Sequence, residues 1–312
     1  MPRWDRSTLG VIATLPPYVD HRQEIIDHPQ VDALRFNTIS PLGGSRSQIL
    51  ERLQRECGDK RLWLDLKGRQ LRIAKFAYLP YAFVELNHRI QVDLPVDVHF
   101  KDCVSRAVEL VDGNKLILNR RPVRVVGEGE PINILDPALK IEGSLTDGDR
   151  EYVEAARKLG LHDFMLSFVE RREDVEELLE LDPEANVIAK IESRKGLDFV
   201  RNDYPALKDK VVLMAARDDL FINLGEAKEE MLEALELLVA SDPDAIAASR
   251  LLCSLEESGQ VAAQDLSDLW LLLKLGFKNF MLSDGLCFRE EAFRSAVGVL
   301  DRVLGAPSEA GE

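Results

Sequence analysis

The feature that most constrains the fold is a repeated alternation of short apolar runs with longer amphipathic stretches. Eight runs have the length and character of strands buried on both faces: 9–14, 33–37, 62–65, 163–168, 186–192, 211–216, 245–249 and 279–283. Amphipathic helical stretches separate most of them, the clearest at 45–56, 148–159, 170–180, 225–240, 265–275 and 290–304. This alternation indicates parallel βα units, and eight units predict an α/β fold, a (β/α)₈ TIM barrel.

One region interrupts this rhythm, because the helical period disappears between about residues 74 and 142. It holds short β-like runs at 90–94, 107–110, 115–118 and 123–126. We therefore predict a small β-rich insertion after the third strand, placed as a lid over the barrel mouth. The expected organisation is 1–73 and 143–305 for the barrel, 74–142 for the insertion, and 306–312 for a disordered tail. Thr146 and Asp149 have the spacing of a capping box at the helix that follows the insertion.

Composition narrows the class of protein. The formal net charge is −15, which argues against binding to nucleic acid or to an anionic membrane. No apolar run reaches about 18 residues, and the N-terminus lacks a signal-peptide core. The four cysteines are scattered singly, which is typical of a reducing compartment. We expect a cytoplasmic enzyme.

Ionisable residues stand at the carboxyl ends of two successive predicted strands. Glu192 ends one apolar run, and Asp219 follows the next. Carboxylates at neighbouring strand ends could hold a hard divalent cation. Lys190 lies two residues before Glu192, and this spacing on a strand puts both side chains on one face.

Five short motifs, in order along the chain, resemble those of the pyruvate kinase family. They are Arg35-Phe36-Asn37 at the second strand, 64–72 with Asp65-Leu66-Lys67-Gly68 at the third, Lys190-Ile191-Glu192, 216–220 with Arg217-Asp218-Asp219, and Met281-Leu282-Ser283 at the eighth. The resemblance extends from strand two to strand eight and is weaker in the insertion. It implies the phosphoenolpyruvate/pyruvate barrel superfamily, in a short and diverged form.

The resemblance also implies roles for single residues. Glu192 and Asp219 would bind Mg²⁺ or Mn²⁺, and Lys190 would stabilise negative charge on an enolate or a transferring phosphoryl group. Arg35 and Arg72 would bind phosphate, and Ser249 would keep the hydroxyl of a seventh-strand threonine. The remaining predicted site residues, all assigned to substrate binding, are Asn37, Asp65, Lys67 and Asp218. The expected substrate is a small keto acid or its enol phosphate, with ADP or ATP as a second substrate.

Several departures from the family pattern affect these expectations. Ile39 and Leu66 stand where the family has Ser and Thr ligands for K⁺, so we expect no dependence on K⁺. Gln70 stands at the position that is Glu in K⁺-dependent members and Lys in K⁺-independent ones. Asp218 replaces a glycine, and Ser283-Asp284-Gly285-Leu286 replaces Ser-Gly-Glu-Thr. The insertion is shorter than the family's nucleotide-clamping domain, and we expect no regulatory domain, so neither ADP binding nor allosteric control is expected to follow the family pattern.

Two alternatives stay open. Ile191-Glu192-Ser193, Gly196-Leu197, Asp219-Leu220 and Leu224-Gly225 also resemble the citrate lyase β-subunit and metal-dependent pyruvate aldolases, which form an enolate without a nucleotide. The second alternative is a degenerate barrel that binds a metabolite or a protein without catalysis. A homo-oligomer is compatible with either.

Structural interpretations compete with the functional ones. Lys190 and Glu192 could form only an ion pair at the barrel mouth, and Arg35 and Arg72 could pair with Asp65. Separately, Arg69 is expected at the surface, and Trp63 and Trp270 are expected in the core.

Overall fold

The computed structural model describes residues 9–77, 82–100 and 103–304. Eight parallel strands form a closed barrel in the order β1-β15-β14-β13-β12-β11-β3-β2, which confirms the predicted fold class. The first and last strands pair directly, with Ile12 of β1 opposite Met281 of β15. The barrel strands are β1 (Val11–Thr14), β2 (Ala33–Asn37), β3 (Arg61–Leu66), β11 (Asp163–Leu166), β12 (Asn186–Ile191), β13 (Val211–Ala216), β14 (Ile246–Ala248) and β15 (Asn279–Leu282).

The barrel strands are apolar on both faces because both faces are covered. All six residues of β13 are buried. Along this strand, Val212 and Met214 belong to the cluster inside the barrel, whereas Leu213 and Ala215 pack outward in the main core. This alternation with a period of two residues explains why the sequence shows continuous apolar runs.

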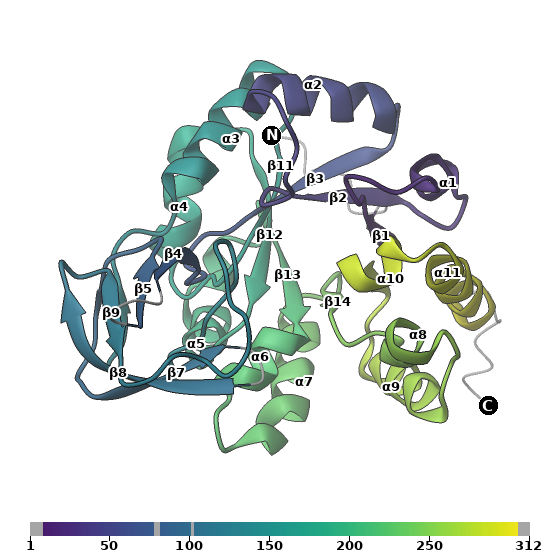
Figure 1. Ribbon diagram of the computed structural model, residues 1–312. Coiled ribbons are helices and arrows are strands. Elements are labelled where there is room, and N and C mark those ends of the chain that lie inside the picture. The colour runs from purple at the N-terminus through teal and green to yellow at the C-terminus, as the bar shows by residue number, and fades with distance from the viewer. Residues whose placement is uncertain (1–8, 78–81, 101–102, 305–312) are drawn as a thin grey trace.

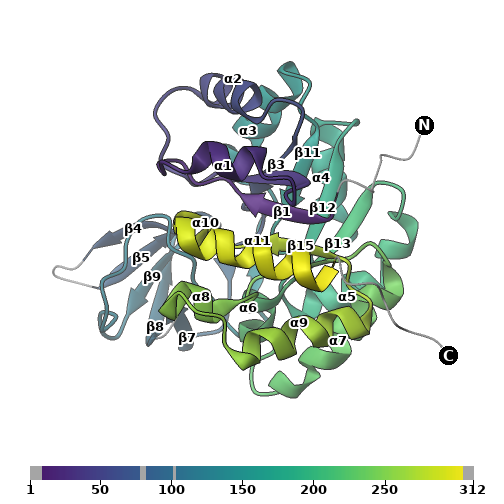
Figure 2. The same cartoon turned by 90° about the vertical axis from the view of Figure 1, so that its right-hand side faces the viewer.

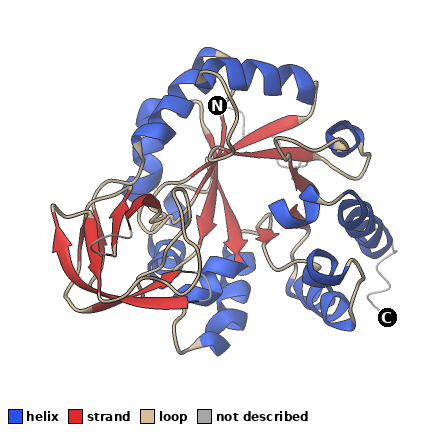
Figure 3. Cartoon of the chain, in the orientation of Figure 1, coloured by secondary structure: helices blue, strands red, loops and turns tan. Residues whose placement is uncertain are grey.

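Helices surround the strands (Figures 1 and 3). The cap of α3 is the capping box expected from the sequence, since the Thr146 side chain accepts from the Asp149 N–H and the Asp149 side chain accepts from the Thr146 N–H. The helices of the part that the structure describes are α1 (Arg22–Asp27), α2 (Arg46–Cys57), α3 (Asp147–Lys158), α4 (Arg172–Leu181), α5 (Arg194–Asn202), α6 (Arg217–Asn223), α7 (Met231–Ser241), α8 (Cys253–Ser258), α9 (Ala263–Leu275), α10 (Asp284–Phe288) and α11 (Glu290–Leu304).

The insertion after β3 is a separate antiparallel sheet in the order β4-β5-β9-β8-β7. It has its own apolar core, to which Val84, Val98, Phe100 and Leu116 contribute. Figure 2 shows the insertion beside one end of the barrel. Its strands are β4 (Ile73–Ala77), β5 (Phe83–Leu86), β7 (Val96–Phe100), β8 (Cys103–Val111) and β9 (Lys115–Leu118), and the short β6 (Ile90–Gln91) pairs with β10 (Lys140–Ile141).

Some local expectations were wrong. The run 123–126 is not a strand, and its side chains Val123 and Val125 are 87% and 85% exposed. Trp270 is 60% exposed on α9, whereas Trp63 is fully buried inside the barrel as expected. The apolar run 123–126 has no neighbouring strand to pair with, so its β-propensity does not produce a strand. For Trp270, the residue type alone does not show which face of the helix is covered.

The division into 1–73, 74–142 and 143–305 remains a prediction, and the expected tail 306–312 lies outside the described residues. Within the described ranges, every helix is too short or too polar to cross a bilayer.

Candidate active site

The predicted site residues gather at the carboxyl ends of the barrel strands. Lys190 lies near the end of β12, on the same face as Ile188, whose side chain belongs to the interior cluster. Glu192 follows two residues later. Both side chains therefore point into the barrel mouth, and they are only 8% and 1% exposed.

Lys190 is held by three side chains. Its Nζ donates to Ser167 Oγ at 2.9 Å and lies 3.2 Å from Glu192 Oε1 and 3.6 Å from Asp65 Oδ1. Burial alone would lower the pKa of Lys190, but the negative charges of Asp65 and Glu192 raise it above its ordinary value. The site therefore contains a buried ammonium that stays protonated.

Glu192 and Asp219 form an acidic pair beside this ammonium. Burial raises the pKa of Glu192 to about 7, assisted by the charge of Asp219 and opposed by Lys190 and by the Phe168 N–H, which donates to Glu192 Oε2 at 2.7 Å. Asp219 lies in the first turn of α6, and its pKa is also raised, by burial and by neighbouring Asp218. Both carboxylates keep a raised pKa although Lys190 lies beside them, so an added cation would favour their ionised forms.

This donor set fits a hard divalent cation. Mg²⁺ needs only one or two protein carboxylates, because water and substrate oxygens complete its octahedron. No group of three or more His, Cys, Asp or Glu side chains suited to a metal occurs in the described ranges. The assignment of Mg²⁺ or Mn²⁺ to Glu192 and Asp219 stays a prediction, in which water and substrate oxygens would complete the coordination.

A second charged cluster lies on β2 and β3. Arg35 donates through Nε and Nη2 to Asp65 Oδ2, and through Nη1 to Thr14 Oγ1 at 2.9 Å and to Asp284 Oδ2 at 2.7 Å. Burial would raise the pKa of Asp65, but Lys190, Lys67 and Arg35 together lower it far below its usual range. The arginine expected to bind phosphate is thus paired with two carboxylates of the protein itself.

Lys67 adjoins the same cluster from the segment after β3. Its Nζ donates to Asn37 Oδ1 at 2.6 Å and lies 3.5 Å from Asp65 Oδ2. Burial lowers its pKa to about 7, and Asp65 only partly opposes this effect. Lys67 can therefore gain or lose a proton near neutral pH.

The backbone that carries Lys67 is fixed by a helix cap. Asp149 accepts the Lys67 N–H at 2.8 Å and the Gly68 N–H at 3.1 Å. Gly68 has φ +51°, and a Cβ there would lie 2.4 Å from the Ser167 carbonyl oxygen. Only glycine can make this close approach, which brings the turn against the strand end that carries Ser167.

Gln70 and Arg72 connect the acidic pair to the insertion. The Gln70 side chain donates to Asp219 Oδ2 at 3.3 Å and accepts from Arg72 Nε at 2.9 Å. Arg72 Nη1 donates to the carbonyl of Gly129, in the loop of the insertion. Arg72 therefore lies at the barrel mouth with its guanidinium already engaged by neutral oxygens.

Two predicted residues lie apart from these clusters. Asp218 pairs with Arg250 at 2.9 Å, and its side chain is 56% exposed. Ser249 has φ +61°, and its carbonyl accepts from Arg217 Nε at 3.1 Å. Asp218 acts on the site through its charge, which raises the pKa of Asp219. The described hydrogen bonds of Ser249 join its backbone carbonyl to Arg217. None of them links its hydroxyl to Lys190.

Ile39 and Leu66 differ in their surroundings. Ile39 is 40% exposed in the loop after β2, whereas Leu66 is fully buried in the main core. Neither side chain offers an oxygen ligand, which leaves the expectation of K⁺ independence in place as a prediction.

Sequence reasoning missed several members of the site. Ser167 binds Lys190, Thr14 binds Arg35, and Asn133 of the insertion hydrogen-bonds to Asp219. Each lies at or beyond a strand end, or in a connecting loop, where a single polar residue gives no distinctive signal. The expected surface position of Arg69 was wrong: it is 4% exposed and pairs with buried Asp174 at 2.7 Å.

Comparisons with known proteins agree with the fold. No protein-family model matches the chain. It is 26% identical over 245 residues to the pyruvate kinase of Thermoplasma acidophilum, covering 72% of this chain and 43% of that protein. It is 21% identical over 303 residues to the pyruvate kinase of Borreliella burgdorferi, covering 88% and 62%. The chain therefore spans roughly half of the length of these curated relatives.

A solved structure gives the same result at the level of the fold. A pyruvate kinase from Cryptosporidium parvum superimposes with a TM-score of 0.71 at 19% identity, over 97% of this chain and 70% of that chain. An eight-stranded barrel with a β insertion after the third strand, and charged side chains at its mouth, defines an α/β barrel of the pyruvate kinase type. The chain is a diverged, pyruvate kinase-like protein.

Proposed function

We propose that the chain is a divalent-metal-dependent enzyme that acts on a small keto acid or its enol phosphate, with phosphoryl transfer as the leading reaction. The observation that carries this proposal is the buried ammonium of Lys190, 3.2 Å from Glu192 in the acidic pair with Asp219. A buried cation beside two carboxylates of raised pKa is an arrangement that favours function over stability.

The chain's own residues supply most of the proposed chemistry. Lys190, oriented by Ser167 and Asp65, would donate a hydrogen bond to the substrate oxygen on which negative charge develops. Lys67, whose pKa is about 7, would move a proton at the opposite side of Asp65. A Mg²⁺ or Mn²⁺ ion held by Glu192 and Asp219 would act as a Lewis acid on the oxo group of the substrate.

Phosphoryl transfer would require Arg35 and Arg72 to change their present contacts. Both would have to turn part of their guanidinium toward a phosphoryl group, and ADP would have to bind near the insertion. The sequence relationship to pyruvate kinases supports this reading.

One observation favours a second candidate, an enolate-forming lyase or aldolase. Asp284 holds Arg35 Nη1 at 2.7 Å, so a carboxylate already lies on the face of the arginine where phosphate would bind. An anionic phosphoryl group would be repelled there, whereas an enolate at Lys190 would not need this arginine.

A pair of assays separates the candidates. The first follows ADP-dependent conversion of phosphoenolpyruvate to pyruvate with Mg²⁺ or Mn²⁺. The second follows metal-dependent exchange of the C3 protons of pyruvate in D₂O, which reports enolate formation without a nucleotide. Transfer supports the leading reaction, and exchange without transfer supports the lyase. If the protein shows neither reaction, and neither metal nor oxalate raises Tm, the proposal is rejected in favour of a non-catalytic barrel.

A further inference from the structure

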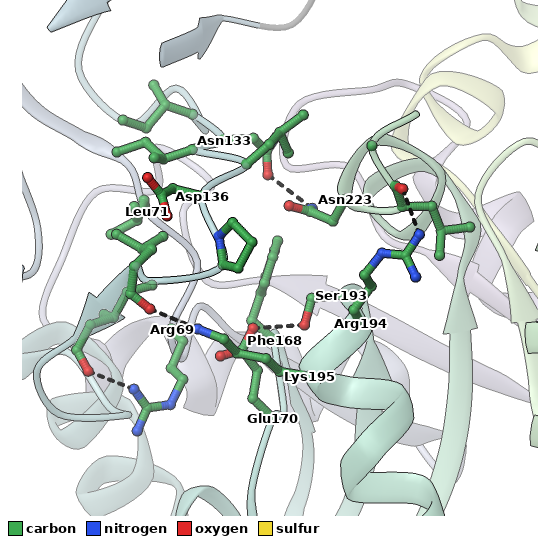
Figure 4. Close-up of a pocket in the computed structure, with 18 of the residues that line it drawn as sticks. Arg69, Leu71, Asn133, Asp136, Phe168, Glu170, Ser193, Arg194, Lys195 and Asn223 are labelled. Carbon is green, nitrogen blue, oxygen red and sulfur yellow. Dashed lines mark hydrogen bonds between the residues drawn. The ribbon is translucent and has the colours of Figure 1, made fainter. Parts of the chain in front are cut away.

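A cavity of about 340 Å³ lies beside the acidic pair, and none of the roles assigned above uses it. It opens between the insertion segment 132–141 and the loops that follow β11, β12 and β13. Figure 4 shows its lining residues arranged around an open centre, with Asn133 and Asn223 at one edge and Glu170 with Ser193 at another. Its volume is in the range of pockets that bind small molecules.

The walls of the cavity are largely apolar. Ile132, Ile134 and Leu139 line it from the insertion, and Phe168 and Leu224 line it from the barrel. Ligand pockets are typically apolar with a few polar groups that fix orientation.

The charged side chains around the cavity already have partners, and within the described residues only one buried donor among them, Arg69 Nη2, lacks a hydrogen-bond acceptor. Ser193 Oγ donates to Glu170 at 2.7 Å, Lys195 Nζ donates to the Leu139 carbonyl at 2.7 Å, and Arg69 pairs with Asp174. A phosphate or nucleotide would have to displace these interactions. An apolar group would displace none of them.

Three lining residues also contact the acidic pair. The Phe168 N–H donates to Glu192 at 2.7 Å. Asn223 Nδ2 donates to the Asp219 carbonyl at 2.9 Å and to Asn133 Oδ1 at 3.1 Å, and the Asn133 side chain hydrogen-bonds to the Asp219 carboxylate. Phe168, Asn133 and Asn223 therefore border both the cavity and the acidic pair.

We propose that this cavity receives the side chain of the substrate, and that the preferred substrate is a 2-oxo acid with a branched aliphatic or aromatic group on C3 instead of the hydrogen of pyruvate. This inference rests on the proposed function, since the oxo acid head must bind at Glu192 and Asp219. Each methylene that leaves water for apolar walls strengthens binding about fourfold. A tail of several carbons should therefore bind tens of times more tightly than pyruvate.

The test measures dissociation constants by calorimetry on the full chain with saturating Mg²⁺. The probes are oxalate, which has no tail, pyruvate, 4-methyl-2-oxopentanoate and phenylpyruvate. Ile134→Trp fills the cavity from the insertion. Leu135→Trp fills it from a partly exposed position and serves if the buried Ile134 site does not accept the larger ring. Val108→Trp, at a 48% exposed site on β8 outside the cavity lining, is the matched control.

We expect the unmodified protein and the Val108→Trp control to bind both long oxo acids at least tenfold more tightly than pyruvate. The filled variants should lose this preference while binding oxalate and pyruvate as before. Equal binding of short and long oxo acids, or a preference that survives in both filled variants, overturns the inference and leaves the proposed function intact. If neither oxalate nor any oxo acid binds, the proposed function fails, and the inference fails with it.

Discussion

At the scale of single residues, the site is organised around Lys190. Its ammonium is within 3.6 Å of two carboxylates, Asp65 and Glu192, and the more distant Asp219 acts on it as well. In a simple structural ion pair, the lysine would lower the pKa of its carboxylate partner below the ordinary value. Here the pKa of Glu192 stays raised, because burial and Asp219 outweigh the effect of Lys190. A further cation beside Glu192 and Asp219 would favour the ionised forms of both carboxylates.

Replacement of Lys190 tests its role directly. We expect Lys190→Met to reduce turnover a hundredfold or more, because one preorganised charge is typically worth a few kcal/mol in the transition state. Stabilisation by Mg²⁺ should remain, since Glu192 and Asp219 are intact. The measurements are initial rates and Tm with and without metal, with the exposed Lys158→Met as control. Full activity in Lys190→Met would remove Lys190 from the mechanism.

The aliphatic residues Ile39 and Leu66 lead to a prediction about monovalent cations. Neither can coordinate K⁺. Activity should therefore be the same in K⁺, Na⁺ and tetramethylammonium salts at equal ionic strength. A rise of tenfold or more with K⁺ alone would show that other oxygens supply the site.

At the scale of elements, the start of α3 does more than cap a helix. Asp149 accepts the Thr146 N–H within the capping box, and it also accepts the N–H groups of Lys67 and Gly68. A cap that local sequence predicts therefore positions a loop 82 residues away in the chain.

Two variants of this cap should differ in their effects. Thr146→Ala removes one capping hydroxyl, which typically costs about 1 kcal/mol of stability. Asp149→Ala also leaves buried N–H groups without an acceptor and should cost roughly 2–4 kcal/mol. Denaturant unfolding measures both. Asp149→Ala should also weaken oxalate binding, because the Lys67 turn loses its anchor; equal effects of the two variants would argue against this second role.

At the scale of the whole molecule, two buried groups make metal-free stability depend on pH in opposite directions. The pKa of Glu192 is raised to about 7 in the folded state, so the stability it contributes is present below about pH 4.5 and is lost as pH rises to 7. The pKa of Lys67 is lowered to about 7, so folding is penalised at low pH, and stability is regained between pH 7 and 10.5. Together these two groups give the metal-free protein a minimum in its free energy of unfolding near neutral pH.

Bound metal should offset the loss of stability that accompanies ionisation of Glu192. Because Mg²⁺ or Mn²⁺ binds the ionised carboxylate, the gain in Tm on adding metal should grow from pH 5 to pH 7.5. Glu192→Gln should flatten the metal-free profile over the same interval, by on the order of 1–3 kcal/mol, and abolish the response to metal. A metal response that is independent of pH would place the ion away from Glu192.

Most of the elements, and the faces of several strands, could be predicted from the sequence alone. Strand period, helix caps and the charged ends of apolar runs are local properties, so Lys190 and Glu192 could be assigned to one face of one strand, and the eight βα units could be counted. These properties depend on neighbours within a few residues, and no distant partner needs to be known.

Which charges pair with one another could not be predicted, because it depends on how the barrel closes. Arg35 and Asp284 are 249 residues apart, and they pair because the barrel closes β1 between β2 and β15. Arg69 is buried because Asp174 of α4 lies beside it, and the run 123–126 is a loop because no strand lies beside it. Burial and pairing energies arise from contacts made on closure, and the same residue types in sequence are compatible with several such pairings.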